Sequence, residues 1–149
     1  LGADMIAAAE GALAKYTPPL VLIDMGTATT LSVLDETGAF LGGAIAPGVR
    51  LSAEALAQRT GLPLPELTAP ESALSRSTVD CLRSGTVLGA AAMVDGMLDR
   101  LEASLGAPVT AVATGGLAGC VIPHCRRPVI LDDALLLQGL AVMYSRETK

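Results

Sequence analysis

The segment Asp24-Met25-Gly26-Thr27-Ala28-Thr29-Thr30 holds the residue types best suited to chemistry in this chain. A carboxylate at the end of an apolar run is followed by glycine and several hydroxyls in a tight turn. The turn's N–H groups and hydroxyls can hold a phosphate, while Asp24 can hold a cation beside it. The same pattern also fits a β-hairpin turn whose threonines satisfy their own backbone. The residues alone leave both interpretations open.

Two further positions offer chemistry. Asp4 stands where a helix begins and could act as a general base, although an acid there also simply stabilises the helix dipole. Thr114-Gly115-Gly116 follows an apolar strand, as a turn that contacts a nucleotide would. It is neither a Walker loop nor a complete G-x-G-x-x-G motif, because Thr114 occupies the first glycine position.

The composition excludes several classes of protein. The 149 residues suit one domain, and with 51% hydrophobic and 17% charged residues the chain is not disordered. A net charge of −5 and 2% aromatic residues argue against a nucleic-acid partner. The most apolar stretch, residues 134–143, is about half the length that a membrane span needs. Three widely spaced cysteines, an odd number, favour a reduced, cytoplasmic location.

The order of the predicted elements indicates the fold class. Three strands joined by short turns must be antiparallel, and the strand–helix–strand units that follow add parallel strands. We therefore predict an α/β fold, with a mixed sheet of three antiparallel strands followed by βαβ units and helices on both faces. This layout resembles a ribonuclease-H-like, or actin-like, half-domain. The predicted helices are 5–15, 51–59, a long one from Ser77 or Thr78 to about 105, a short one after 116, and 134–146; the predicted strands are 20–24, 31–34, 39–46, 109–113 and 129–131.

Four motifs in a fixed order resemble those of type III pantothenate kinases. They are G-A-D at residues 2–4, I-D-M-G-T-A-T-T at 23–30, L-G-G-A-I-A-P-G at 41–48 and A-T-G-G-L-A at 113–118. The resemblance runs over essentially the whole chain. It implies an ATP-dependent kinase of the acetate kinase, sugar kinase, Hsp70 and actin superfamily. Such a kinase phosphorylates the primary hydroxyl of pantothenate in coenzyme A biosynthesis.

The resemblance also implies roles for particular residues. Asp4 matches the proton acceptor, and Asp24 the ligand of a monovalent cation, potassium or ammonium. ATP and magnesium are the other expected cofactors, and the expected assembly is a cytoplasmic homodimer. The implied pantothenate site comprises Gly2, Ala3, Asp4, Met5 and Thr78, and the implied nucleotide site comprises Gly26, Thr27, Gly115 and Gly116.

Two departures from the family pattern count against a simple assignment of these roles to this chain. Family members have Arg where this chain has Met5. This chain therefore lacks a guanidinium group that could pair with an acidic substrate. Family members also carry an N-terminal half whose D-x-G-N-T turn embraces the ATP phosphates. We expect residues 1–149 to be the other half, a single actin-like domain that is inactive alone.

Two other functions are compatible with the sequence. One is a non-catalytic family member that acts as an accessory or regulatory protein, which Met5 favours. The other is an actin-like kinase that acts on a different small hydroxyl compound. Binding of ATP and pantothenate separates the first from a kinase, and a panel of substrates decides the second.

Overall fold

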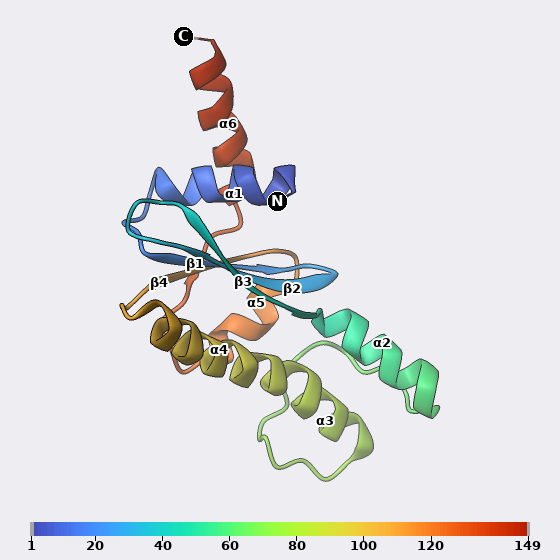
Figure 1. Ribbon diagram of the computed structural model, residues 1–149. Helices are drawn as coiled ribbons and strands as arrows, with labels where there is room; N and C mark the ends of the chain where they lie inside the picture. The colour runs from blue at the N-terminus through green and yellow to red at the C-terminus, as the bar shows by residue number, and fades with distance from the viewer. Residues whose placement is uncertain (1, 149) are drawn as a thin grey trace.

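The computed structural model describes residues 2–148, and these form one mixed sheet between two layers of helices (Figure 1). The strands lie in the order β3-β2-β1-β4-β5. β1 pairs antiparallel with β2 and β2 antiparallel with β3, while β1–β4 and β4–β5 are parallel. The predicted antiparallel strands and parallel additions are therefore confirmed. The strands are β1 (Leu20–Met25), β2 (Ala28–Leu34), β3 (Phe40–Pro47), β4 (Thr110–Thr114) and β5 (Ile130–Leu131).

The helices follow the predicted order, and the long helix differs in one detail. They are α1 (Ala3–Leu13), α2 (Val49–Thr60), α3 (Thr78–Arg83), the π-helical turn η1 (Ser84–Leu88), α4 (Gly89–Leu105), α5 (Ala118–Val121), the 3₁₀ turn η2 (Ile122–His124) and α6 (Leu135–Glu147). The predicted long helix thus contains a π-helical turn, where the Thr86 hydroxyl donates to the Leu82 carbonyl. Ser77 is its N-cap, because the Ser77 hydroxyl accepts from the Asp80 N–H.

The start of β2 corrects the sequence prediction. We expected residues 25–30 to be turn, but β2 already begins at Ala28. Thr29 and Thr30 pair with β1 on one side and with β3 on the other. Because two strands supply hydrogen-bond partners there, the ladder extends closer to the turn than the threonine-rich sequence suggested.

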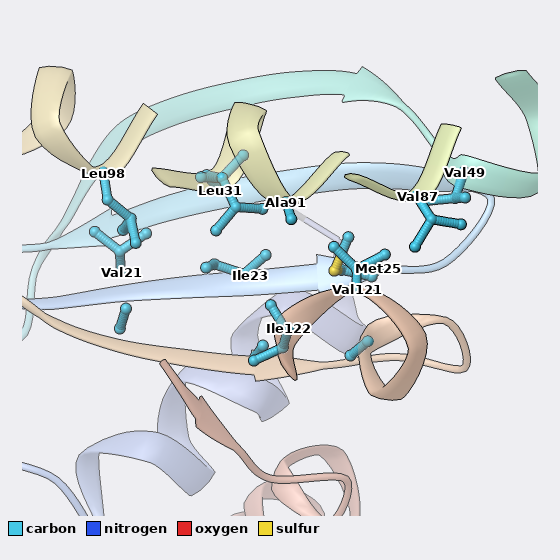
Figure 2. Close-up of a cluster of buried hydrophobic side chains, with 14 of the residues drawn as sticks. Val21, Ile23, Met25, Leu31, Val49, Val87, Ala91, Leu98, Val121 and Ile122 are labelled. Carbon is cyan, nitrogen blue, oxygen red and sulfur yellow. The ribbon is translucent and has the colours of Figure 1, made fainter. Parts of the chain in front are cut away.

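Residue alternation along β1 assigns each face of the sheet to its helices. Val21, Ile23 and Met25 point towards α4 and α5, where they join the larger hydrophobic core (Figure 2). Leu20 and Leu22 point the other way and pack with α1 and α6. Since successive strand residues face opposite sides, Asp24 lies on the α1 face. The predicted cover of helices on both faces is confirmed.

Contact between α1 and α6 depends on two glycines. A side chain on Gly139 would collide with the Ala7 carbonyl of α1, and one on Gly11 would collide with the Leu135 carbonyl of α6. The two helix backbones therefore touch directly. This contact fixes α6 against the helix that carries Asp4.

We expect Gly139→Ala to lower the free energy of unfolding by about 3 kcal/mol or more, because the added methyl forces the two backbones apart. Gly89→Ala is the matched control, since Gly89 is also helical and its added Cβ meets nothing within 4 Å. Alanine there should stabilise the helix by up to about 1 kcal/mol. Urea denaturation measures both. Equal effects of the two substitutions would contradict the proposed backbone contact.

Candidate active site

A row of polar side chains crosses three strands beneath α1. Asp24 of β1 pairs with Thr30 of β2 and with Thr114 of β4. Residues paired across a sheet point to the same face, so all three side chains share the α1 face. Leu22, Ser32 and Val112 form the next row and continue that face into the core. The row lies at the carboxyl ends of the parallel strands β1 and β4, where open α/β sheets bind ligands.

Asp4 faces this row from the first turn of α1. Gly2 is the N-cap of α1, and Asp4 is the acidic residue of the first turn. Burial raises the pKa of Asp24, and the negative charge of Asp4 raises it further. The two carboxylates therefore lie close enough to repel each other. A cation between them would relieve that repulsion.

The Thr114-Gly115-Gly116 turn is held against the end of β1. Gly115 has a φ of +105°, in the region that only glycine adopts without strain, and a side chain there would collide with the Met25 backbone. The Leu117 N–H donates to the Met25 carbonyl at 3.1 Å and closes the contact. On the other side, a Cβ added at Gly116 would meet nothing within 4 Å, so the turn presents open backbone to a ligand.

Asp4, Asp24 and the Thr114-Gly115-Gly116 turn line one open cavity of about 470 Å³. Four residues from the predicted site line it: Asp4, Asp24, Gly115 and Gly116. Its wall also includes Thr114, Gly119, Leu136 and a third carboxylate, Asp133. Among the described residues, none that lines this cavity is Lys or Arg. A phosphate would therefore need backbone N–H groups and a cation to bind here.

Sequence reasoning missed Asp133, whose place depends on its neighbour. Asp132 is buried, and its carboxylate accepts from the Lys15 ammonium and the Tyr16 hydroxyl, both at 2.6 Å, and from the Ala134 N–H at 3.1 Å. Burial opposes ionisation, yet these hydrogen bonds lower the pKa of Asp132 overall. The network ties the end of α1 to the start of α6 and so fixes Asp133 at the cavity. The sequence signal was the acidic pair before an apolar helix.

The side chain of Met5, a residue of α1, points towards the sheet. It is partly buried and packs against the core that includes Leu20 and Leu22. It also lines a small enclosed cavity of about 50 Å³ with Asp4 and Asp24. Arginine at this position would therefore lie near both carboxylates, whereas Met5 leaves them without that charge.

The other predicted site residues lie outside the cavity wall. Gly2 and Ala3 begin α1, and Gly26 and Thr27 form the β1–β2 turn directly after Met25. Gly48 packs tightly on that turn, where its N–H donates to the Thr27 carbonyl at 3.0 Å. Thr78 is exposed and lines a different cavity of about 500 Å³, between α2 and α3. One copy of the chain therefore does not bring Thr78 to Asp4.

Comparison with known sequences decides the family. The family described as type III pantothenate kinase matches residues 1–100. The chain belongs to this family. Type III pantothenate kinases from Exiguobacterium sp. strain AT1b and Thermomicrobium roseum are 41% and 43% identical to it, over 100% and 98% of the chain. These matches cover 59% and 57% of the two relatives, so the chain spans about three-fifths of their length.

Solved structures confirm the fold of this pantothenate kinase family member. A conserved Baf family protein from Campylobacter jejuni superposes with a TM-score of 0.73 at 20% identity, covering 99% of this chain and 65% of that one. The activator of the 2-hydroxyisocaproyl-CoA dehydratase from Clostridium difficile, solved with bound ADPNP, gives a TM-score of 0.50 at 16% identity, covering 98% and 69%. At these identities the likeness concerns the fold, which is the predicted ribonuclease-H-like, actin-like half-domain.

Among residues 2–148, no helix is both long enough and apolar enough to cross a lipid bilayer.

Proposed function

We propose that this chain supplies the Asp4–Asp24 half of a type III pantothenate kinase, which transfers a phosphoryl group from ATP to the primary hydroxyl of pantothenate. The observation that carries the proposal is the cavity in which Asp4, Asp24 and the Thr114-Gly115-Gly116 turn meet. Phosphoryl transfer depends mainly on alignment and neutralised charge, and this cavity offers a base, oxygen ligands and open backbone together. Family membership supports the same function.

Each residue then has a defined task. Asp4 accepts the proton of the attacking hydroxyl, and Gly2 and Ala3 place the substrate beside it. Gly115 and Gly116 contact the nucleotide through backbone N–H groups, and Gly26 and Thr27 contact its phosphates from the neighbouring turn.

A bound cation fits the donor set of the cavity. Carboxylate and hydroxyl oxygens are ligands that potassium and magnesium bind, and Asp24 and Thr114 of the cavity wall supply them, with Thr30 next to Asp24 in the same row. The mutual repulsion of Asp4 and Asp24 favours positive charge at the same place. We propose that Asp24 holds potassium or ammonium, and that magnesium enters with ATP. Such ions would neutralise the phosphate charge that no cationic residue of the cavity wall offsets.

Mass spectrometry of the product tests the function. This chain is co-expressed with the remaining two-fifths of the Exiguobacterium relative, and we call the pair the reconstituted enzyme. Pantothenate incubated with ATP and the reconstituted enzyme should gain one phosphoryl group. A panel of other small hydroxyl compounds is the control. Phosphorylation of a panel member in preference to pantothenate would overturn the substrate assignment.

Asp24→Asn in the reconstituted enzyme should lower kcat/KM for ATP by about 10²-fold, because the cation loses its charged ligand. Activation by potassium, measured against tetramethylammonium, should be blunted. Since folding raises the pKa of Asp24, its ionisation weakens the folded state as pH rises through that range. The variant should therefore unfold no more easily at pH 7. An unchanged potassium dependence would remove Asp24 from this role.

We further propose that the working form is a cytoplasmic homodimer. Thr78 lies apart from Asp4 within one copy but faces the open apolar cavity between α2 and α3. Val49, Leu56 and Leu82 line this cavity, and Leu56 is 41% exposed. A second copy seated there would cover this apolar surface. It would also allow Thr78 to contact pantothenate held by the partner.

Met5 supports a second candidate function, that of a non-catalytic accessory or regulatory protein. Its side chain brings no positive charge to the small cavity that it lines with Asp4 and Asp24. Such a protein would bind partners but would not turn over ATP and pantothenate.

We expect Met5→Arg to tighten pantothenate binding by about tenfold, since a charge-assisted pair with the substrate carboxylate contributes about 1.5–3 kcal/mol before the loss of Met5 packing. Calorimetric titration of the reconstituted enzyme with pantothenate measures it. Met5→Lys is the control, because lysine restores charge without the planar fork and should give the smaller gain. Unchanged affinity in the arginine variant would indicate a different substrate or a compensating residue.

A further inference from the structure

The first turn of α2 carries a cationic side chain next to the β1–β2 turn. Gly48, the N-cap of α2, donates its N–H to the Thr27 carbonyl at 3.0 Å. A Cβ added at Gly48 would collide with the carbonyl oxygens of Gly26 and Thr27, so the start of α2 packs directly on this turn. Arg50 is the second residue of α2 and is exposed. Its side chain therefore begins two residues from the contact with the turn.

The start of α5 packs at the same end of the sheet. The Leu117 N–H donates to the carbonyl of Met25, the residue that precedes the β1–β2 turn. Val49 of α2, Met25 of β1 and Val121 of α5 belong to one buried cluster (Figure 2). The beginnings of α2 and α5 and the end of β1 are thus held together around the turn.

The position of Arg50 relative to α5 is also visible in the electrostatics of a neighbouring thiol. Burial raises the pKa of Cys120, and the positive charge of Arg50 partly opposes this rise, so the two side chains lie near each other. Cys120 packs against the core on the α5 face of the sheet. Asp24 lies on the opposite, α1 face. Arg50 and Asp24 therefore flank the β1–β2 turn from the two faces of the sheet.

The guanidinium of Arg50 has no acidic partner in the described part of the chain. The ion pairs among residues 2–148 use the cations Lys15, Arg83, Arg127 and Arg146. Val49, Ser52 and Leu56 line the apolar cavity between α2 and α3, and Arg50 does not. A second copy seated over that cavity would therefore leave Arg50 available to a ligand of the turn.

A nucleotide brings several negative charges to this end of the sheet. Among the described residues that line the cavity of Asp4 and Asp24, none is Lys or Arg. The planar guanidinium of an arginine matches phosphate oxygens with paired N–H donors. We propose that Arg50 binds the phosphates of ATP from the α5 face, opposite the cation held by Asp24. The inference rests on the proposed function in taking the β1–β2 turn as the phosphate contact.

Calorimetric titration of the reconstituted enzyme with ATP, and separately with adenosine, tests the contact in the absence of pantothenate. Arg50→Gln should raise the Kd for ATP about tenfold and leave the Kd for adenosine within about twofold, because only ATP offers phosphates to a charge-assisted pair. Arg50→Lys should give the smaller loss, since lysine keeps the charge without the planar fork. In steady-state kinetics, Arg50→Gln should raise the KM for ATP more than it lowers kcat.

Arg59→Gln is the matched control. Arg59 is exposed in the last turn of the same helix, about 13 Å further along its axis than Arg50. Its substitution removes the same charge from the same helix, so it measures any general effect of net charge on ATP binding. The Kd of this variant for ATP should stay within about twofold of the wild-type value, because exposed charges that far apart are largely screened. Thermal unfolding of each variant shows that these exposed substitutions leave the fold intact.

Four results would overturn the role of Arg50. They are a wild-type enzyme that does not bind ATP, an Arg50→Gln variant that binds ATP as tightly as the wild type, equal losses for ATP and adenosine, and an equal loss of ATP binding in Arg59→Gln. A selective loss of ATP binding in Arg50→Gln, in an enzyme that phosphorylates another hydroxyl compound in place of pantothenate, would overturn the proposed substrate and leave the role of Arg50 standing.

Discussion

Asp4→Asn is expected to lower kcat of the reconstituted enzyme by about 10²–10⁴-fold, the usual contribution of a general base. Asp4 stands at the first turn of α1 and lines the same cavity as Asp24 and the Thr114-Gly115-Gly116 turn. An amide keeps the shape of the side chain but cannot accept the hydroxyl proton. The KM for ATP should change much less than kcat, because Asp4 acts on the attacking group. Steady-state kinetics over a range of both substrates measures this difference.

Asp133→Asn is the matched control for Asp4. It removes the same charge from the same cavity wall but from the loop before α6. If Asp4 is the base, the control should retain kcat within about threefold, a difference of under 1 kcal/mol. Equal losses in both variants would show that the cavity needs negative charge rather than a base at position 4.

Most of the fold could be predicted because local signals and tertiary packing agree. The apolar run before Asp24 indicates a strand, and the residues around Asp35 indicate a hairpin turn. The proline-rich stretch of residues 63–70, after α2, indicates an irregular segment. The Asp35 carboxylate indeed accepts from the N–H groups of Thr37 and Ala39 in the β2–β3 turn. The early start of β2 could not be predicted, since it depends on pairing with β3, residues distant in the sequence. The same holds for the contact of Gly139 with α1, which no local pattern indicates.

The meeting of Asp4 and Asp24 follows from the place of each residue in its element. Asp24 is the next-to-last residue of β1 and Asp4 lies in the first turn of α1, and both line one cavity. Met5 illustrates the limit of such reasoning. The family resemblance implied a place for Met5 in the pantothenate site, and the structure shows that its side chain also packs against the core beneath α1. Asp133 was missed because its place depends on the Asp132 network, whose partners come from the other end of the chain.

The 149-residue chain alone is expected to fold but not to turn over ATP and pantothenate. Its sheet has helices and a hydrophobic core on both faces, which is sufficient for an independent domain of this length. We propose, however, that its cavity offers phosphate contacts from one side only, through the backbone of Gly115 and Gly116. Holding the transferred group from both sides is most of what such a kinase contributes, and alignment alone supplies about 7–11 kcal/mol of the barrier reduction.

A coupled ATP-consumption assay checks this expectation in three arms: the chain alone, the relative's remaining two-fifths alone, and the reconstituted enzyme. Activity should appear only in the third arm, because only there does a second surface close over Asp4 and Asp24. Circular dichroism and cooperative urea unfolding of the chain alone establish that it is folded. If the folded chain turned over substrate at a rate near that of the reconstituted enzyme, its own cavity would be a complete active site. The second half-domain would then contribute stability or regulation rather than catalysis.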